Sequence, residues 1–126
     1  MKTQTTRKIT PLEEELSQFT GTENYYKSSF GMLNVTDGVH YLRTEGQCYW
    51  LIDIIESYQK KIAHKTPFQV WKLIVKDNKG LVTCEDGNYN LVIKQEIPYT
   101  DFEEKTGMKE IELYCTNGVV LLPSEY

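Results

Sequence analysis

The amino-acid sequence predicts an α+β fold, in which N-terminal helices pack on one face of a roughly five-stranded antiparallel meander sheet. Helical periodicity is confined to residues 10–62, whereas strand-like alternation of apolar and polar residues is confined to 68–122. The turns between successive predicted strands are too short for parallel crossovers, which need about a dozen residues or more. Since no linker-like stretch divides the chain, we expect one α+β domain over 10–126, behind a flexible tail at 1–9.

The N-terminal half is expected to begin with a helix at 11–19. Thr10 can cap this helix, and Gly21 can end it in a left-handed conformation. A loop and a short strand at 32–35 should follow. Cap or turn residues then begin a second, short helix within 36–46.

The strongest helix is predicted at 47–62, where apolar residues recur with the 3.6-residue period of an α-helix. Its main apolar positions are Cys48, Leu51, Ile52, Ile55 and Ile62. The opposite stripe is polar and is expected in solvent, with Glu56 and Lys60 spaced for an i,i+4 ion pair. The wide apolar arc predicts that the other face of this helix is buried against the sheet.

Five strands are predicted from period-2 alternation and from β-branched and aromatic residues. They span 68–75, 81–85, 89–97, 110–115 and 119–122. Residues 99–109 are expected to form a loop. The pair Asn117-Gly118 is the strongest hairpin-turn signal in the chain.

Composition and charge exclude several classes of protein. The 126-residue chain carries 14 Lys and Arg against 18 Asp and Glu, a net charge of −4, with no basic stripe. Direct nucleic-acid binding, and an accessory role in nucleic-acid transactions, are therefore disfavoured. No apolar run approaches the ~20 residues that a membrane span needs, so no membrane association is expected. The cysteines follow no C-x-x-C pattern and no signal peptide is present, which together favour a cytoplasmic protein.

Chemistry-bearing residues gather between 36 and 53, but no catalytic motif is present. One interpretation pairs a Cys48 thiolate near a helix N-terminus with His40 as its base. The other places Cys48 on the apolar arc and His40 in solvent. Asp37 is likewise either a site acid or an ordinary turn or cap residue, and the cap is favoured. The spacing favours the second interpretation. We therefore predict no catalytic residue, no cofactor and no metal site.

The nine tyrosines are the residues that packing explains least well, because Tyr and Trp are enriched at interfaces. The leading hypothesis is a non-enzymatic protein-interaction module with a protein partner or a second copy of itself. The alternative is an enzyme or small-molecule-binding protein, with a pocket between the 38–62 helices and the sheet. The candidate binding residues of the two hypotheses are Tyr25, Tyr26, Asp37, His40, Tyr41 and Asp53.

Several segments together resemble a family of small uncharacterised bacterial proteins. They are 19–26, Thr36–Leu42, Tyr49–Asp53, 57–59, 69–73 and Leu121–Tyr126. The resemblance extends over nearly the whole chain, from residue 11 to residue 126. It implies a bacterial origin and an association with mobile elements such as plasmids, phages or conjugative transposons, including interference with host defence. It implies no activity, no cofactor and no catalytic residue.

Overall fold

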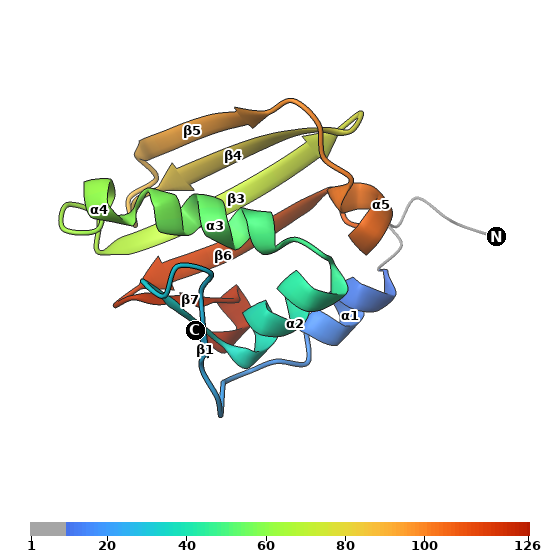
Figure 1. Ribbon diagram of the computed structural model, residues 1–126, viewed down its shortest axis with the longest axis horizontal. Coiled ribbons are helices and arrows are strands. Elements are labelled where there is room, and N and C mark those ends of the chain that lie inside the picture. The colour runs from blue at the N-terminus through green and yellow to red at the C-terminus, as the bar shows by residue number, and fades with distance from the viewer. Residues whose placement is uncertain (1–9) are drawn as a thin grey trace.

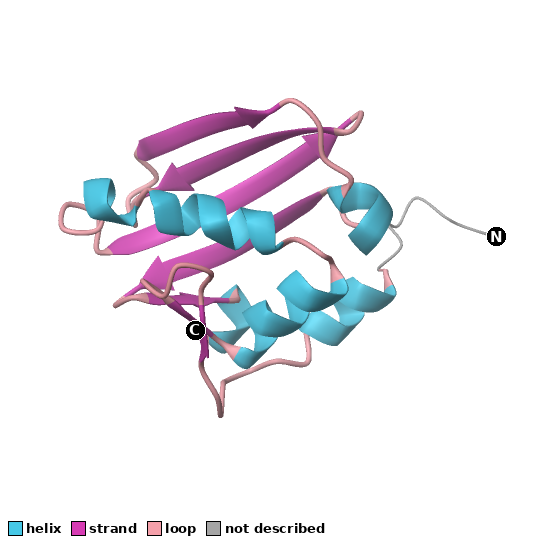
Figure 2. Cartoon of the chain, viewed as in Figure 1, coloured by secondary structure: helices cyan, strands magenta, loops and turns pink. Residues whose placement is uncertain are grey.

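The computed structural model describes residues 10–126 and shows a seven-stranded mixed sheet with helices on one face (Figure 1 and Figure 2). The strand order across the sheet is β1-β2-β7-β6-β3-β4-β5. The strands are β1 (Tyr26–Lys27), β2 (Asn34–Val35), β3 (Phe68–Lys76), β4 (Lys79–Glu85), β5 (Leu91–Ile97), β6 (Glu110–Thr116) and β7 (Val119–Leu121). The helices are α1 (Pro11–Leu16), α2 (Asp37–Glu45), α3 (Tyr49–Ser57), α4 (Gln59–Ile62) and α5 (Phe102–Thr106), with a 3₁₀ helix η1 at Pro123–Glu125. Within the described residues, no helix is both long enough and apolar enough to span a membrane.

The meander is confirmed for the central strands, but the sheet is larger than predicted and is not wholly antiparallel. β3, β4 and β5 pair antiparallel in chain order, and β6 pairs antiparallel with β3 and β7. The two further strands, β1 and β2, contain two residues each. β2 lies within the short strand predicted at 32–35, whereas β1 was not predicted, because two residues are too few to show a period-2 pattern in the sequence. β2 also runs parallel to β7, a strand from the other end of the chain.

The core lies between α3 and the central strands. Leu51, Ile52 and Ile55 of α3 are buried, and so are Trp71 and Leu73 of β3. The predicted apolar arc is therefore confirmed, and Trp71, only 1% exposed, is a core residue. These side chains fill the space between α3 and β3.

The predicted helix 47–62 is two helices, because the chain breaks at Tyr58 between α3 and α4. The Tyr58 hydroxyl donates a hydrogen bond of 2.7 Å to Oε1 of Gln95 on β5. The amide of Gln59 exchanges two hydrogen bonds with the amide of Gln69 on β3, at 2.9 and 3.0 Å. The side chains of Tyr58 and Gln59 thus both reach the sheet. In one regular helix, two consecutive side chains would point about 100° apart, so the break lets both make these contacts.

Residues 99–109, predicted as a loop, contain α5. The Phe102 side chain of this helix is 1% exposed and therefore belongs to the core. The predicted helix 11–19 is shorter than expected and ends at Leu16, with Ser17 rather than Gly21 as its C-cap. The predicted strand 89–97 begins only at Leu91, because Tyr89 adopts a left-handed backbone conformation (φ 68°) in the preceding turn.

Glu56 is buried, contrary to the prediction of a solvent-exposed pair with Lys60. Its side chain is 1% exposed, and its carboxylate accepts three hydrogen bonds from the segment before β2. The donors are the Ser28 hydroxyl at 2.6 Å and the backbone N–H groups of Met32 at 2.8 Å and Phe30 at 3.1 Å. The carboxylate of an α3 residue thus holds the turn between β1 and β2 in place.

Candidate functional site

Strand β7 covers only the C-terminal part of β6. The paired residues are Tyr114 with Leu121, Cys115 with Val120 and Thr116 with Val119. After Leu121 the chain leaves the sheet and enters η1. Among the described residues 10–126, residues 110–113 of β6 therefore have a neighbouring strand on the β3 side only, and the other side of this segment faces α1 (Figure 1).

The uncovered half of the β6 edge presents backbone donors and acceptors. The Val75 N–H donates a 2.7 Å hydrogen bond to the Lys109 carbonyl, which fixes Lys109 as a residue directed toward β3. Because the direction of N–H and C=O alternates along a strand, those of Glu110 and Glu112 point away from β3. Within residues 10–126, no strand or loop pairs with these groups of Glu110 and Glu112.

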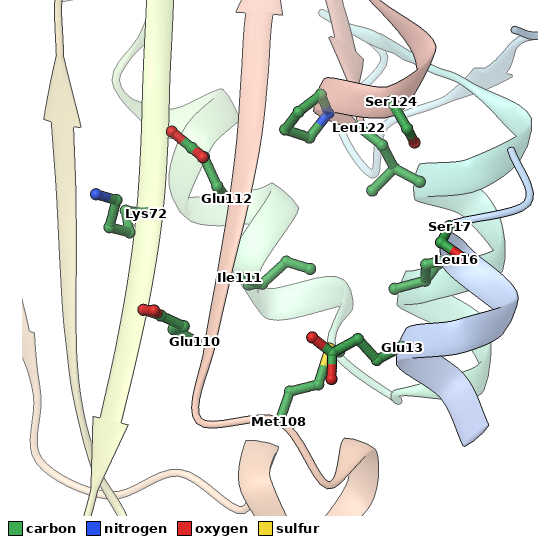
Figure 3. A pocket seen from close by; sticks show the side chains of 11 residues that line it. Glu13, Leu16, Ser17, Lys72, Met108, Glu110, Ile111, Glu112, Leu122 and Ser124 are labelled. Atoms are coloured by element: carbon green, nitrogen blue, oxygen red, sulfur yellow. The ribbon is translucent and has the colours of Figure 1, made fainter. Parts of the chain in front are cut away.

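These backbone groups lie beside a groove of about 450 Å³ between α1 and β6 (Figure 3). Its apolar lining includes Leu16 from α1, Met108 just before β6, Ile111 in β6 and Leu122 just after β7. This volume lies within the roughly 300–1,000 Å³ typical of ligand sites. The groove thus combines an open strand edge with an apolar floor.

The rim of the groove is acidic on the sheet side. Glu110 and Glu112 both line it, and their side chains point to the sheet face opposite the helices, as does that of Lys72 from β3 (Figure 3). Lys72 lies directly opposite Glu112 in the β3–β6 pairing. Two carboxylates against one ammonium give this stretch of the edge a net negative charge at neutral pH.

The C-terminus keeps the groove open by turning the chain away from β6. The Glu125 carboxylate accepts hydrogen bonds from the Thr36 hydroxyl at 2.6 Å and from the N–H of Gly38 at 3.1 Å, at the start of α2. It also accepts one from the N–H of Leu122 at 2.9 Å. A Cβ atom on Gly38 would lie 2.5 Å from Cδ1 of Leu122, so glycine permits this close approach.

Three of the candidate residues predicted from sequence come together beside α2. The Tyr26 hydroxyl donates a 3.0 Å hydrogen bond to Oδ1 of Asp37, and the Tyr26 ring stacks on His40 with centroids 4.0 Å apart. Nε of Arg43 donates to Nδ1 of His40 at 3.1 Å. The other carboxylate oxygen of Asp37 accepts from the N–H of Glu23 at 2.9 Å.

The electrostatics of this cluster favour a structural role. Hydrogen bonds, first from the Glu23 backbone and also from Tyr26, lower the pKa of Asp37 despite partial burial. Burial, together with the neighbouring Arg43 guanidinium, lowers the pKa of His40. The hydrogen bond to Asp37 raises the pKa of the Tyr26 phenol. The network therefore holds a charged Asp37, a neutral His40 and a protonated Tyr26 against one another near neutral pH.

The other three candidate residues point elsewhere. Tyr25 is 59% exposed beside β1. Tyr41 packs its ring against Phe19, with centroids 5.5 Å apart. Asp53 lies on α3, and its buried Oδ1 has no hydrogen-bond partner among residues 10–126. The six candidates therefore do not converge on one place.

The cysteines are placed as small core residues. Cys48 is 1% exposed at the start of α3, and burial raises the pKa of its thiol to about 12. Burial has the same effect on Cys84 and Cys115. The thiolate required by the Cys48–His40 interpretation is thus disfavoured at neutral pH. In the described part of the chain, no three His, Cys, Asp or Glu side chains are grouped so as to hold a metal ion.

Sequence reasoning did not find the groove, although one signal for it exists. Ile111 lies on the helix side of β6, whereas Glu110 and Glu112 lie on the opposite face, as the alternation of side chains along a strand requires. The proline at position 123 ends the last strand after fewer residues than β6 contains. A strand that is shorter than its hairpin partner leaves part of the partner's edge without a neighbouring strand. The difference in length between the last two strands is visible in the sequence.

The fold and the groove together define a mixed α/β module whose sheet has one partly uncovered inner strand. A family model described as a family of unknown function, DUF6876, matches residues 10–126, and the chain belongs to that family. No curated protein and no solved structure matches the chain. Membership confirms the resemblance to an uncharacterised family, while the bacterial and mobile-element origin stays a prediction.

Proposed function

We propose that the chain is a non-enzymatic protein-interaction module that binds an extended segment of a partner protein in the groove between α1 and β6. The segment adds a strand to β6 and pairs with the N–H and C=O groups of Glu110 and Glu112. The observation that carries this proposal is that the uncovered half of β6 borders an apolar groove. Strand addition takes its affinity from the main chain and its specificity from alternate side chains.

The alternation of side chains defines the segment that fits. Residues placed opposite Glu110 and Glu112 have their side chains on the same sheet face as these carboxylates, at about 5 Å between Cβ atoms. Basic side chains are favoured there. The residue between them lies opposite Ile111 and points toward Leu16 and Met108, so an apolar side chain is favoured. The ligand is therefore an extended basic–apolar–basic segment, antiparallel to β6 as β7 is.

Fluorescence anisotropy with labelled five-residue peptides tests the proposal. The Lys-Leu-Lys-Leu-Lys peptide is expected to bind, and the Glu-Leu-Glu-Leu-Glu peptide is not. In the antiparallel pairing the N–H groups of the lysines face β6. N-methylation of the lysines should therefore abolish binding, whereas N-methylation of the leucines should leave it intact. Equal binding of both methylated peptides would contradict strand addition.

A charge reversal on the rim is expected to weaken binding of the Lys-Leu-Lys-Leu-Lys peptide. Glu112→Lys replaces a favourable cross-strand pair by a like-charge pair, which should weaken binding roughly 5- to 30-fold, since each such pair is worth up to about 1 kcal/mol. Glu45→Lys is the matched control, because it makes the same charge change on the exposed end of α2. Equal losses in the two variants would show attraction by net charge alone and would overturn the proposed site.

A further inference from the structure

The second long edge of the sheet is β5. In the part of the chain that the structure describes, this strand pairs only with β4, and Figure 1 shows no helix or strand beyond it. It contains seven residues, whereas the strand at the opposite edge, β1, contains two. Lys94 and Glu96, both exposed, have their side chains on the sheet face opposite the helices. A long exposed edge strand is a template for pairing with another chain.

The turn between β3 and β4 determines which backbone groups of β4 face β5. Asp77 and Asn78 have φ of 54° and 61°, as in a two-residue type I′ hairpin turn. The residues that flank such a turn, Lys76 and Lys79, form a hydrogen-bonded pair. The N–H and C=O of Lys79 therefore face β3. Because this direction alternates along β4, the N–H and C=O of Val82 face β5.

The outward backbone groups of β5 follow from its register with β4. Val82 lies opposite Gln95, so the N–H and C=O of Gln95 face β4. The N–H and C=O groups of its neighbours Lys94 and Glu96 therefore point away from β4, toward the open edge of the sheet. Within residues 10–126 nothing forms a hydrogen bond with these outward groups.

We propose that two copies of the chain pair antiparallel through β5, about a two-fold axis at Gln95, into one continuous sheet. In this register Lys94 of each copy lies opposite Glu96 of the other. Both residues direct N–H and C=O outward, so each such pair exchanges both backbone hydrogen bonds. The same pairs place an ammonium opposite a carboxylate, which stabilises the contact. On the helix side, Ile93 of each copy lies opposite Ile97 of the other.

The charges select this register over its neighbours. An axis at Lys94 would place Lys94 opposite Lys94, and an axis at Glu96 would place Glu96 opposite Glu96. Like charges directly opposite each other are destabilising. Charges on an edge strand often prevent pairing, but here their spacing of two residues lets unlike charges meet across a two-fold axis.

The dimer goes beyond the proposed function and would change how the protein binds. β6 is separated from β5 by β3 and β4, so the two grooves would lie far apart on the joined sheet. A partner with two matching segments would then bind both copies, with an affinity gain set by the length of its linker.

Sedimentation equilibrium of the full chain tests the proposal through a charge swap. The wild-type chain is expected to dimerise. Lys94→Glu and Glu96→Lys should each weaken the dimer about tenfold or more, because two like-charge pairs replace two unlike pairs. The double variant Lys94→Glu/Glu96→Lys should restore wild-type dimerisation. A wild-type chain that stays monomeric at all concentrations, or a double variant no better than the single ones, would overturn the proposal.

A cysteine placed on the axis provides a second, independent readout. In a non-hydrogen-bonded antiparallel pair the Cα atoms are about 4.5 Å apart, within the range that a disulfide spans. Gln95→Cys is therefore expected to give a disulfide-linked dimer on non-reducing electrophoresis. Thr83→Cys on β4 is the control and should stay monomeric. The three native cysteines are buried and do not compete. Equal cross-linking of the two variants would contradict the proposed axis.

Discussion

Replacement of Glu56 by alanine is expected to lower the free energy of unfolding by about 2–4 kcal/mol, because hydrogen bonds to a charged group are worth about 1.5–3 kcal/mol each and part of that loss is offset by removal of a buried charge. The carboxylate accepts from Ser28, Phe30 and Met32. Without it, these donors lose their partner between α3 and the β1–β2 turn. We therefore expect the 28–33 segment to loosen before the rest of the chain unfolds.

Urea unfolding followed by circular dichroism measures this effect. Glu45→Ala is the control, because Glu45 is exposed on α2 and its replacement should change the free energy of unfolding by no more than about 0.5 kcal/mol. Glu56→Gln should fall between the two variants, since it keeps one acceptor oxygen. If Glu56→Ala were as stable as Glu45→Ala, the carboxylate would not hold the turn.

Proline at two adjacent positions of β6 is expected to have opposite consequences. The N–H of Ile111 is directed toward β3, so Ile111→Pro removes a backbone hydrogen bond between β6 and β3. It should lower the free energy of unfolding by about 3 kcal/mol or more. The N–H of Glu112 points into the groove. Glu112→Pro should therefore leave the fold intact, as proline is tolerated on a free strand edge. It should nevertheless abolish binding of the Lys-Leu-Lys-Leu-Lys peptide, because a donor for the added strand is missing.

The free energy of unfolding and the peptide affinity of each proline variant separate these outcomes. Ile111→Ala and Glu112→Ala are the reference variants, because they remove the same side chains and keep the backbone N–H. If Glu112→Pro destabilised the chain as much as Ile111→Pro does, the N–H of Glu112 would be bonded within the fold. The proposed free edge would then be wrong.

Features set by neighbouring residues were predictable from the sequence. Thr10 caps α1 as expected, since its hydroxyl accepts a hydrogen bond from the Glu13 N–H. The cap of α2 is Thr36, whose hydroxyl accepts from the Val39 N–H, and not Asp37 as predicted, because Asp37 is already the first residue of the helix. Asn117 and Gly118 form the predicted tight turn, with φ of 54° and 75°. Asp37 and His40 lie within one helical turn, so their proximity also followed from their spacing. In each case the determining contacts span only a few residues of the chain.

Features set by distant contacts were not predictable in this way. Nothing near Glu56 in the sequence indicates that its carboxylate meets a segment more than twenty residues earlier in the chain. The pairing of β2 with β7 likewise joins the two ends of the chain through two residues on each strand. A third long-range contact lies beside the groove, because the Glu125 carboxylate binds Thr36 and Gly38 at the start of α2 and so holds the residues after β7 away from β6.

Amide hydrogen exchange at four consecutive residues of β6 tests the central claim most directly. In the free chain, the amides of Ile111 and Leu113 should exchange slowly, because they bond to β3, whereas those of Glu110 and Glu112 should exchange fast. Saturation with the Lys-Leu-Lys-Leu-Lys peptide should slow exchange at Glu110 and Glu112. Equal protection of all four amides in the free chain, or no change on saturation with the peptide, would contradict strand addition at this edge.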